Sequence, residues 1–170
     1  VDLDTLLLVR HAKAGSRSRY HGDDRLRPLD PEGRTQADAL SALLPAFGTN
    51  EIHSADRTRC EQTLAPTARA LGVPIIMEST LSEEAFRDDP VAAQRRIVDL
   101  ATDSGSVVRA VCSQGKVIPP PMEWWAEQDG LTLTRTRSRK ASVWLLGFVG
   151  GVLVTADHLE SPLPASVRDD

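Results

Sequence analysis

A chain of 170 residues has the size of one domain, large enough to bury roughly two-thirds of the surface that it exposes when unfolded. Its composition, 41% hydrophobic and 26% charged, is typical of soluble globular proteins, and no apolar run approaches the ~20 residues that cross a bilayer. The net charge of -4 argues against nonspecific binding of nucleic acid. Length, composition and charge thus exclude membrane-spanning proteins and disfavour nucleic-acid binders.

The chain begins at Val1, without a methionine or a basic-then-apolar leader, so we expect a piece of a longer polypeptide. Cys60 and Cys112 form neither a disulfide framework nor a metal-binding spacing, which favours core positions and a reducing cytoplasm. Residues 1–160 are expected to form the domain. Residues 161–170, rich in Pro, Ser and Asp, are expected to form a loosely ordered tail.

The first predicted element is a buried strand that ends in charged side chains. Leu6 to Val9 are all apolar, as in a strand buried on both faces, and Arg10, His11 and Lys13 follow closely. Ligands of open α/β sheets bind beyond the carboxyl ends of the strands. Arg10 and His11 are therefore placed where a ligand site forms, with a polar loop after a core strand as the alternative.

A cationic segment, Gly15 to Leu29, follows this strand and carries four arginines among Ser, Gly and Asp residues. Long segments without regular structure are often functional, so this one is a candidate cover for the site. The alternative is a solvated basic loop. His21 lies within the segment and would approach the site if the cover closed.

The following residues alternate predicted helices with predicted strands. Asp30 caps a helix that starts at Pro31, and Gly48 ends it. Strands are expected at 51–55, 73–77 and 107–112, helices at 57–71 and 90–101, and an exposed acidic segment at 79–89. This alternation predicts the α/β class, with a mostly parallel sheet and helices on both faces.

The last third of the chain predicts a short helix and a hairpin. The helix carries Trp124 and Trp125, and adjacent residues face different ways on a helix, so one ring is expected in the core and the other on a lid or contact surface. Two β-prone runs flank Gly150-Gly151 and predict an antiparallel hairpin at the sheet edge, over residues 142–148 and 152–156.

Arg135, Arg137, Arg139 and Lys140 form a basic stretch before this hairpin. In an extended chain its arginines share one face, where they would meet nucleotide phosphates or an acidic partner surface. A solvated basic edge strand that protects against aggregation is an equal alternative.

Polar residues at the predicted strand ends suggest phosphate chemistry. Guanidinium groups match phosphoryl oxygens in charge and geometry, and a neutral imidazole beside them can attack phosphorus to give a phosphohistidine. The sequence has no glycine-rich phosphate loop ending in Lys-Ser or Lys-Thr, no Gly-x-Ser-x-Gly and no His-Glu-x-x-His. The residues concerned are Arg10, His11, Ser54, Arg59, Glu83 and Gln114.

Leu8 to Ala12, reading Leu-Val-Arg-His-Ala, resembles the signature of the histidine phosphatase superfamily, which includes the phosphoglycerate mutases. Four further motifs of that family have similar segments in the same order, at Leu29–Ala37, His53–Thr63, Leu81–Glu83 and Val111–Gly115. The resemblance implies a phosphoglycerate mutase-like fold.

The resemblance also implies a role for each matched residue. His11 would be the nucleophile, and Arg10 and Arg59 would hold the phosphoryl group and stabilise its oxygens in the transition state. Glu83 would protonate the leaving oxygen. The family spacing alone selects Glu83 over Glu84.

Gln114 departs from the family, which has its second histidine at this position. Its amide can offer the phosphoryl group only a neutral hydrogen bond, and losing one preorganised donor typically costs ~10²–10³ in rate. Two hypotheses follow. One is a slow phosphohydrolase acting on a nucleotide-like phosphorylated small molecule, and the other is a degenerate domain that binds phosphate-bearing ligands or packs against a partner.

The Arg-His-Ala-Lys segment together with Gln114 is similar to the carboxy-terminal domain of two-domain mycobacterial MutT-type proteins. In those proteins an amino-terminal Nudix domain hydrolyses oxidised guanine nucleotides and dinucleoside polyphosphates. This resemblance implies a covalently attached Nudix partner, Mg²⁺ in that partner alone, and no cofactor or metal here. His21, His53 and His158 have no family counterparts and are expected to be surface or satisfied polar residues.

Overall fold

A mixed six-stranded sheet forms the centre of the structure, a computed structural model that describes residues 3–102, 105–133 and 138–164. The strands lie in the order β3-β2-β4-β1-β5-β6. The first four strands of the chain run parallel, and β5 is antiparallel to both of its neighbours. Their bounds are β1 Asp4–Arg10, β2 Glu51–Ala55, β3 Ile75–Glu78, β4 Arg109–Ser113, β5 Val143–Val149 and β6 Val152–Leu159.

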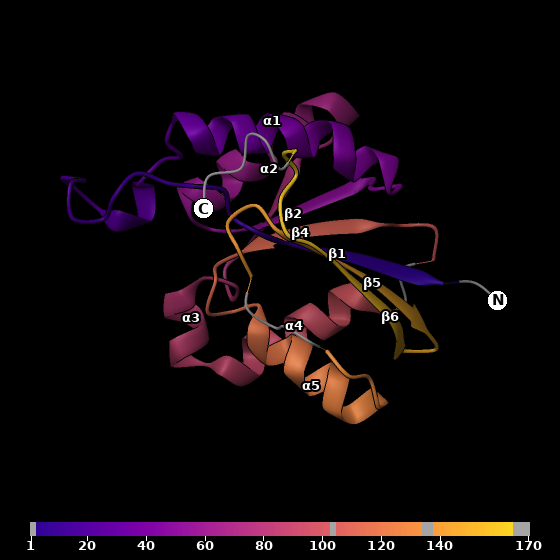
Figure 1. Ribbon diagram of the computed structural model, residues 1–170. Helices are drawn as coiled ribbons and strands as arrows, with labels where there is room; N and C mark the ends of the chain where they lie inside the picture. Colours follow the sequence, from indigo (N-terminus) through magenta and orange to yellow (C-terminus); the bar gives the residue numbers. More distant parts are fainter. Residues whose placement is uncertain (1–2, 103–104, 134–137, 165–170) are drawn as a thin grey trace.

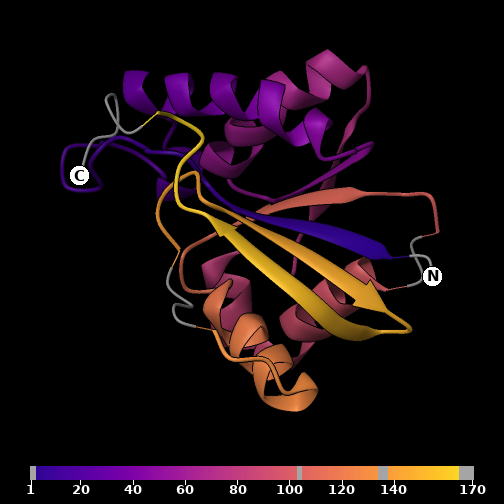
Figure 2. The same cartoon turned by 45° about the vertical axis from the view of Figure 1, so that its right-hand side comes forward.

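Helices cover both faces of this sheet (Figure 1). One face carries α1 (Pro31–Ala46) and α2 (Thr58–Leu71), and the other carries α3 (Glu83–Asp88), α4 (Pro90–Ala101) and α5 (Pro119–Asp129). The turned view shows the same two layers (Figure 2). The predicted α/β class, with a mostly parallel sheet, helices on both faces and an antiparallel edge hairpin, is confirmed.

Strand β1 is buried on both faces, as its unbroken apolar run predicted. The four residues Leu6–Val9 are each 0% exposed. Cys60 and Cys112 are free thiols buried in the same core. In α5, Trp125 is 1% exposed and packs in the core, whereas Trp124 is 36% exposed. The two adjacent tryptophans thus divide between core and surface, as the helical geometry required.

The acidic segment at residues 79–89 was expected to be exposed, but only residues 79 and 87–89 are, and the segment contains a helix that was not predicted. This helix is α3, whose N-cap Ser82 accepts a hydrogen bond from the N–H of Ala85 at 3.1 Å. Leu81 before the cap is 0% exposed. Glu83 and Glu84 occupy the first turn, where carboxylates interact favourably with the helix dipole. The acidic residues therefore mark the start of a helix.

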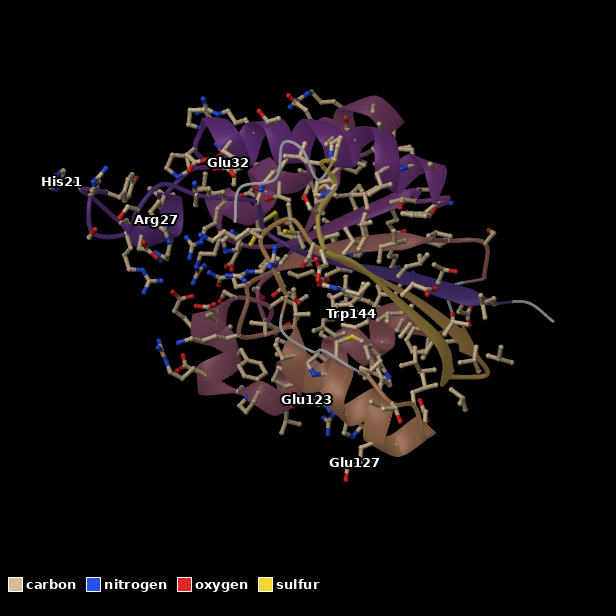
Figure 3. All side chains as sticks on the ribbon, viewed as in Figure 1. His21, Arg27, Glu32, Glu123, Glu127 and Trp144 are labelled. Atoms are coloured by element: carbon tan, nitrogen blue, oxygen red, sulfur yellow. The ribbon has the colours of Figure 1, made fainter. Side chains whose placement is uncertain are left out.

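The cationic segment Gly15–Leu29 was predicted to be a long loop without regular structure, but it has structure of its own. It contains the 3-10 turn η1 (Asp24–Leu26), and a bridge pairs Leu29 with Ala14. His21 is exposed at the tip of the loop and points away from the sheet (Figure 3). Arg27, in contrast, is buried. The segment therefore presents η1 and Arg27, not His21, to the rest of the domain.

The C-terminal hairpin is confirmed, with Gly150 and Gly151 in its turn at φ values of 57° and 81°. Glycine adopts this left-handed backbone without steric cost. In the basic stretch, the described residues Ser138–Lys140 form a loop, so they contain neither the extended segment nor the edge strand that were considered as alternatives.

Arg135 and Arg137 lie outside the described residues, as do positions 165–170 of the expected tail. Over the described parts of the chain, none of the helices combines the length and the hydrophobicity needed to traverse a bilayer.

Candidate active site

The carboxyl ends of β1 and β4 bring two of the predicted site segments together. Arg10 pairs with Ser113 across the two strands, and the N–H of His11 donates to the Ser113 carbonyl oxygen at 3.1 Å. Gln114 follows Ser113 directly, so it lies at the same sheet edge as His11. The prediction that these two strand ends meet at one place is confirmed.

His11 is buried, and its hydrogen bonding fixes the state of its ring. Nδ1 lies 2.8 Å from the carbonyl oxygen of Ala12, and because a carbonyl only accepts, Nδ1 carries the proton. The pKa of His11 is lowered to about 3, chiefly by burial and also by the nearby positive charges of Arg59, Arg10 and Lys140, which together outweigh the opposing hydrogen bond to Ala12. At neutral pH the ring is therefore uncharged, with its lone pair on Nε2.

Residues of α1 and α2 fix the backbone just beyond β1. Thr63 Oγ1 accepts the N–H of Ala12 at 2.8 Å, and Gln36 Oε1 accepts the N–H of Lys13 at 2.9 Å. A Cβ atom at position 33 would come within 1.9 Å of the Lys13 carbonyl oxygen, so only glycine allows α1 to approach this closely. Gly33, Gln36 and Thr63 thus position the segment that follows the histidine.

Arg10 is held at the sheet edge by the loop that precedes β5. Its Nη1 donates to the carbonyl oxygen of Ser138. Its guanidinium lies directly against Gly115, where a Cβ atom would come within 2.8 Å of Arg10 Cζ. Gly115 therefore leaves the space that the first candidate phosphate-binding arginine occupies.

Arg59, on the first turn of α2, is 1% exposed. Its Nη1 donates to the carbonyl oxygen of Asp24 at 2.8 Å, and its Nη2 lies 3.5 Å from Asp24 Oδ2. Its Nε has no hydrogen-bond partner among the described residues. Burial and the charge of Arg27 lower the pKa of Arg59 from its ordinary value. Arg59 is thus a buried cation whose Nε–H remains available to donate to an anion.

The side chain of Gln114 is oriented by the helix that carries the candidate acid. Gln114 is 1% exposed, and its Oε1 accepts the N–H of Glu83 at 2.6 Å. Because the amide oxygen is engaged, the NH₂ group remains to donate. Ser113 Oγ also donates to the carbonyl oxygen of Leu81 at 2.6 Å. The end of β4 and the start of α3 are therefore locked together, with Gln114 presented as a donor.

The two glutamates at the start of α3 have different surroundings. Glu84 Oε2 accepts a hydrogen bond from Nη2 of Arg57 at 2.8 Å. Burial raises the pKa of Glu84, but hydrogen bonds from its own backbone N–H and from Arg57 outweigh that effect, and the pKa lies below its ordinary value. Glu84 is therefore a paired carboxylate, whereas Glu83 lies beside Gln114.

Asp24 is a site residue that the sequence analysis missed. Its carboxylate lies among three guanidinium groups, at 2.8 Å from Arg27 Nε, 3.5 Å from Arg59 Nη2 and 3.6 Å from Arg17 Nη2. The hydrogen bond from Arg27 lowers the pKa of Asp24. The only sequence signal was the mixture of Asp and Arg in the segment, which does not specify the pairing.

The remaining histidines and Ser54 lie apart from this chemistry. His53 is buried and lies 2.6 Å from Glu51 Oε1 and 3.4 Å from Glu78 Oε1, so it is a satisfied polar residue as predicted. His158 packs against an aromatic ring of β5. Ser54 is 0% exposed and donates to the next carbonyl group in the chain.

The lowered pKa of His11 makes the stability of the fold depend on pH. An unfolded chain protonates a histidine near pH 6.5, whereas folded His11 takes up its proton only near pH 3. Between these values the unfolded state binds the additional proton, so stability falls as the pH drops, by up to about 1.4 kcal/mol per pH unit. Above pH 6.5 the contribution is constant.

We expect the variant His11→Gln to lose this dependence. Urea unfolding at pH 6.5 and pH 4.5 should show wild type losing about 2 kcal/mol more unfolding free energy than the variant. The other titrating groups are common to both proteins and cancel in the difference. If the two proteins lost the same unfolding free energy between pH 6.5 and pH 4.5, the result would contradict a neutral, buried His11.

Taken together, these contacts form a site on an α/β domain whose composition suits an oxyanion. An uncharged histidine with a free ring nitrogen lies near two arginines and an amide donor. His11, Arg10 and Gln114 lie at the carboxyl ends of the parallel strands β1 and β4, and Arg59 lies in the first turn of α2. Guanidinium and amide donors suit the oxygens of an oxyanion, and a neutral imidazole suits attack on its central atom.

Comparison with known proteins agrees with this class. Residues 6–89 match the model of the histidine phosphatase superfamily, branch 1. A curated relative from Mycolicibacterium smegmatis, named 8-oxo-(d)GTP phosphatase, is 49% identical over 162 residues, which is 95% of this chain and 50% of the relative. The chain thus spans about half the length of that relative. It belongs to the histidine phosphatase superfamily.

Two solved structures share the fold at low sequence identity. The protein histidine phosphatase SixA complexed with tungstate has a TM-score of 0.70 and 19% identity, with 93% of this chain and 97% of that one covered. Phosphoglycerate mutase from Bacillus anthracis has a TM-score of 0.73 and 15% identity, with 95% and 94% covered. The expected phosphoglycerate mutase-like architecture is confirmed.

Proposed function

We propose that this domain is a slow phosphohydrolase that removes a terminal phosphoryl group through a phosphohistidine at His11. The observation that carries the proposal is the state of the His11 ring. It is buried and uncharged, its Nδ1 is engaged by Ala12, and its Nε2 lone pair is free beside Arg10 and Arg59. A neutral nucleophile between two cations is suited to attack a phosphoryl group.

In the first step, a bond forms between His11 Nε2 and phosphorus while the bond from phosphorus to the leaving oxygen breaks. Glu83 supplies the proton that the leaving oxygen takes up. Arg10, Arg59 and the NH₂ group of Gln114 donate to the three remaining oxygens, which carry the negative charge of the transition state.

In the second step, water attacks the phosphohistidine. The oxygen-to-phosphorus bond forms, the bond to Nε2 breaks, and the Glu83 carboxylate accepts the proton of the water. Orthophosphate leaves and His11 returns to its neutral form. Charge is supplied by arginines throughout, so we propose that this domain uses no metal and that Mg²⁺ belongs to an attached Nudix domain alone.

We propose a nucleotide as the phosphorylated substrate. The name of the Mycolicibacterium relative, 8-oxo-(d)GTP phosphatase, supports this class. We also propose a covalently attached amino-terminal Nudix domain, because this chain spans half of that relative. The two buried free thiols are consistent with a cytoplasmic location, which we propose for the protein.

One feature favours a second candidate function. Gln114 holds Glu83 in place and offers a neutral donor, which serves binding of a phosphate better than its turnover. The domain would then be a catalytically degenerate phosphate-binding module that supports the attached Nudix hydrolase.

The test is release of inorganic phosphate from nucleoside mono-, di- and triphosphates at pH 7. The proposed enzyme releases phosphate above the buffer control from at least one of these compounds. Binding that competes with inorganic phosphate, without release, would favour the degenerate module. Absence of both release and binding would contradict both functions.

A further inference from the structure

The loop before β5 is bound directly to the end of β1. The backbone nitrogen of Ala141 lies 3.2 Å from the carbonyl oxygen of Arg10 and 3.1 Å from that of His11. The N–H of Arg10 donates in turn to the carbonyl oxygen of Ser142 at 3.1 Å. Ala141 is 0% exposed and has a φ of 62°. Non-glycine residues in this left-handed region are uncommon and concentrate at functional sites. The loop is thus held in a specific shape against His11.

This loop brings Lys140 to the candidate site. Lys140 precedes Ala141 and so stands one residue from the backbone contact with His11. Its charge lowers the pKa of His11. Burial lowers the pKa of Lys140 itself, as do the charges of Arg10, Lys13 and Arg27, while the more weakly acting charge of Asp30 opposes them. Lys140 is therefore a cation held among other cations.

Two of the neighbouring cations form ion pairs with carboxylates, whereas Lys140 does not. Arg27 pairs with Asp24 at 2.8 Å and Lys13 pairs with Glu32 at 2.6 Å. Among the residues that the structure describes, none forms an ion pair with Lys140. A cation without an ion pair beside an oxyanion site favours a ligand with more negative charge than one phosphoryl group carries.

We propose that Lys140 binds the second phosphate of a substrate with two adjacent phosphates, so that the site prefers a diphosphate over a monophosphate. This inference rests on the proposed function, in which Arg10, Arg59 and Gln114 hold the transferred phosphoryl group. Lys140 lies on the loop before β5, which carries none of these three residues, and it supplies an additional positive charge. It is a specificity-determining residue, and the chemical step does not pass through it.

The test compares binding of pyrophosphate and of inorganic phosphate by isothermal titration calorimetry at pH 7 and fixed ionic strength. We expect wild type to bind pyrophosphate more tightly than phosphate. Lys140→Gln should weaken pyrophosphate binding about 10-fold and phosphate binding less than 2-fold, because one charge-assisted contact is lost. Lys140→Arg should retain most of the pyrophosphate affinity.

Arg69→Gln is the matched control, since it removes an exposed cation ten residues beyond Arg59 on α2, about 15 Å along the helix. It should leave both affinities unchanged. Equal weakening of both ligands by Lys140→Gln, or no weakening, would overturn the second-phosphate site and leave the proposed function standing. Failure of wild type to bind either probe would contradict the proposed function itself.

Discussion

Replacing His11 by alanine is expected to lower the rate of phosphate release at least ~10³-fold, to the level of the buffer control. The physical reason is that the variant lacks the Nε2 lone pair. The arginines and Gln114 remain to bind the phosphoryl group, but no described group with the same free nitrogen lies between them. Phosphate release measured at saturating nucleotide would show the effect in kcat.

His21→Ala is the matched control for this variant. His21 is exposed at the tip of the loop and points away from the sheet (Figure 3), so its removal should leave kcat and KM unchanged. Binding of inorganic phosphate by His11→Ala should persist, because the arginine donors are intact. Equal rates of phosphate release by wild type and His11→Ala would contradict the proposal that the domain is an enzyme.

Restoring a histidine at position 114 is expected to raise kcat by about 10- to 100-fold. One ring nitrogen of the new side chain can accept the N–H of Glu83, as Gln114 Oε1 does at 2.6 Å, while the other nitrogen donates to the phosphoryl group. If the new imidazole is protonated instead, both ring nitrogens donate, so the contact with Glu83 is lost, but positive charge is added at the oxygen where charge develops.

The companion variant is Gln114→Ala, which removes the donor and leaves the N–H of Glu83 without its acceptor. It should bind phosphate more weakly than wild type and turn over more slowly. Steady-state kinetics should give the highest kcat for Gln114→His, an intermediate kcat for wild type and the lowest for Gln114→Ala, in the order of donor strength at this position. An unchanged kcat in Gln114→His would mean that the site is limited by some other group.

Several features of the fold were accessible from the sequence because they depend on local patterns. The unbroken apolar run Leu6–Val9 is specific to a strand buried on both faces, and the structure has it at 0% exposure. The abrupt change to Arg10 and His11 located the sheet edge. Gly150-Gly151 specified a turn with positive φ, which the hairpin contains. Each signal lies within a few residues of the structure that it predicts.

The features that were missed depend on contacts distant in sequence. The basic stretch was one candidate for contact with nucleotide phosphates, but nothing in it indicates that the N–H of Ala141 will reach the carbonyl oxygens of Arg10 and His11. The contacts of Asp24 with three arginines likewise depend on how η1 packs against α2. Helix α3 was missed because its acidic first turn resembles an exposed loop.

The most direct measurement of the central claim is transfer of a phosphoryl label to the protein. After incubation with a nucleotide labelled in its terminal phosphate and rapid quenching, wild type should carry an acid-labile, base-stable label on His11, as a phosphohistidine requires. His11→Ala should carry none. Phosphate release by wild type that proceeds without any such label, or a label that persists in His11→Ala, would contradict the account.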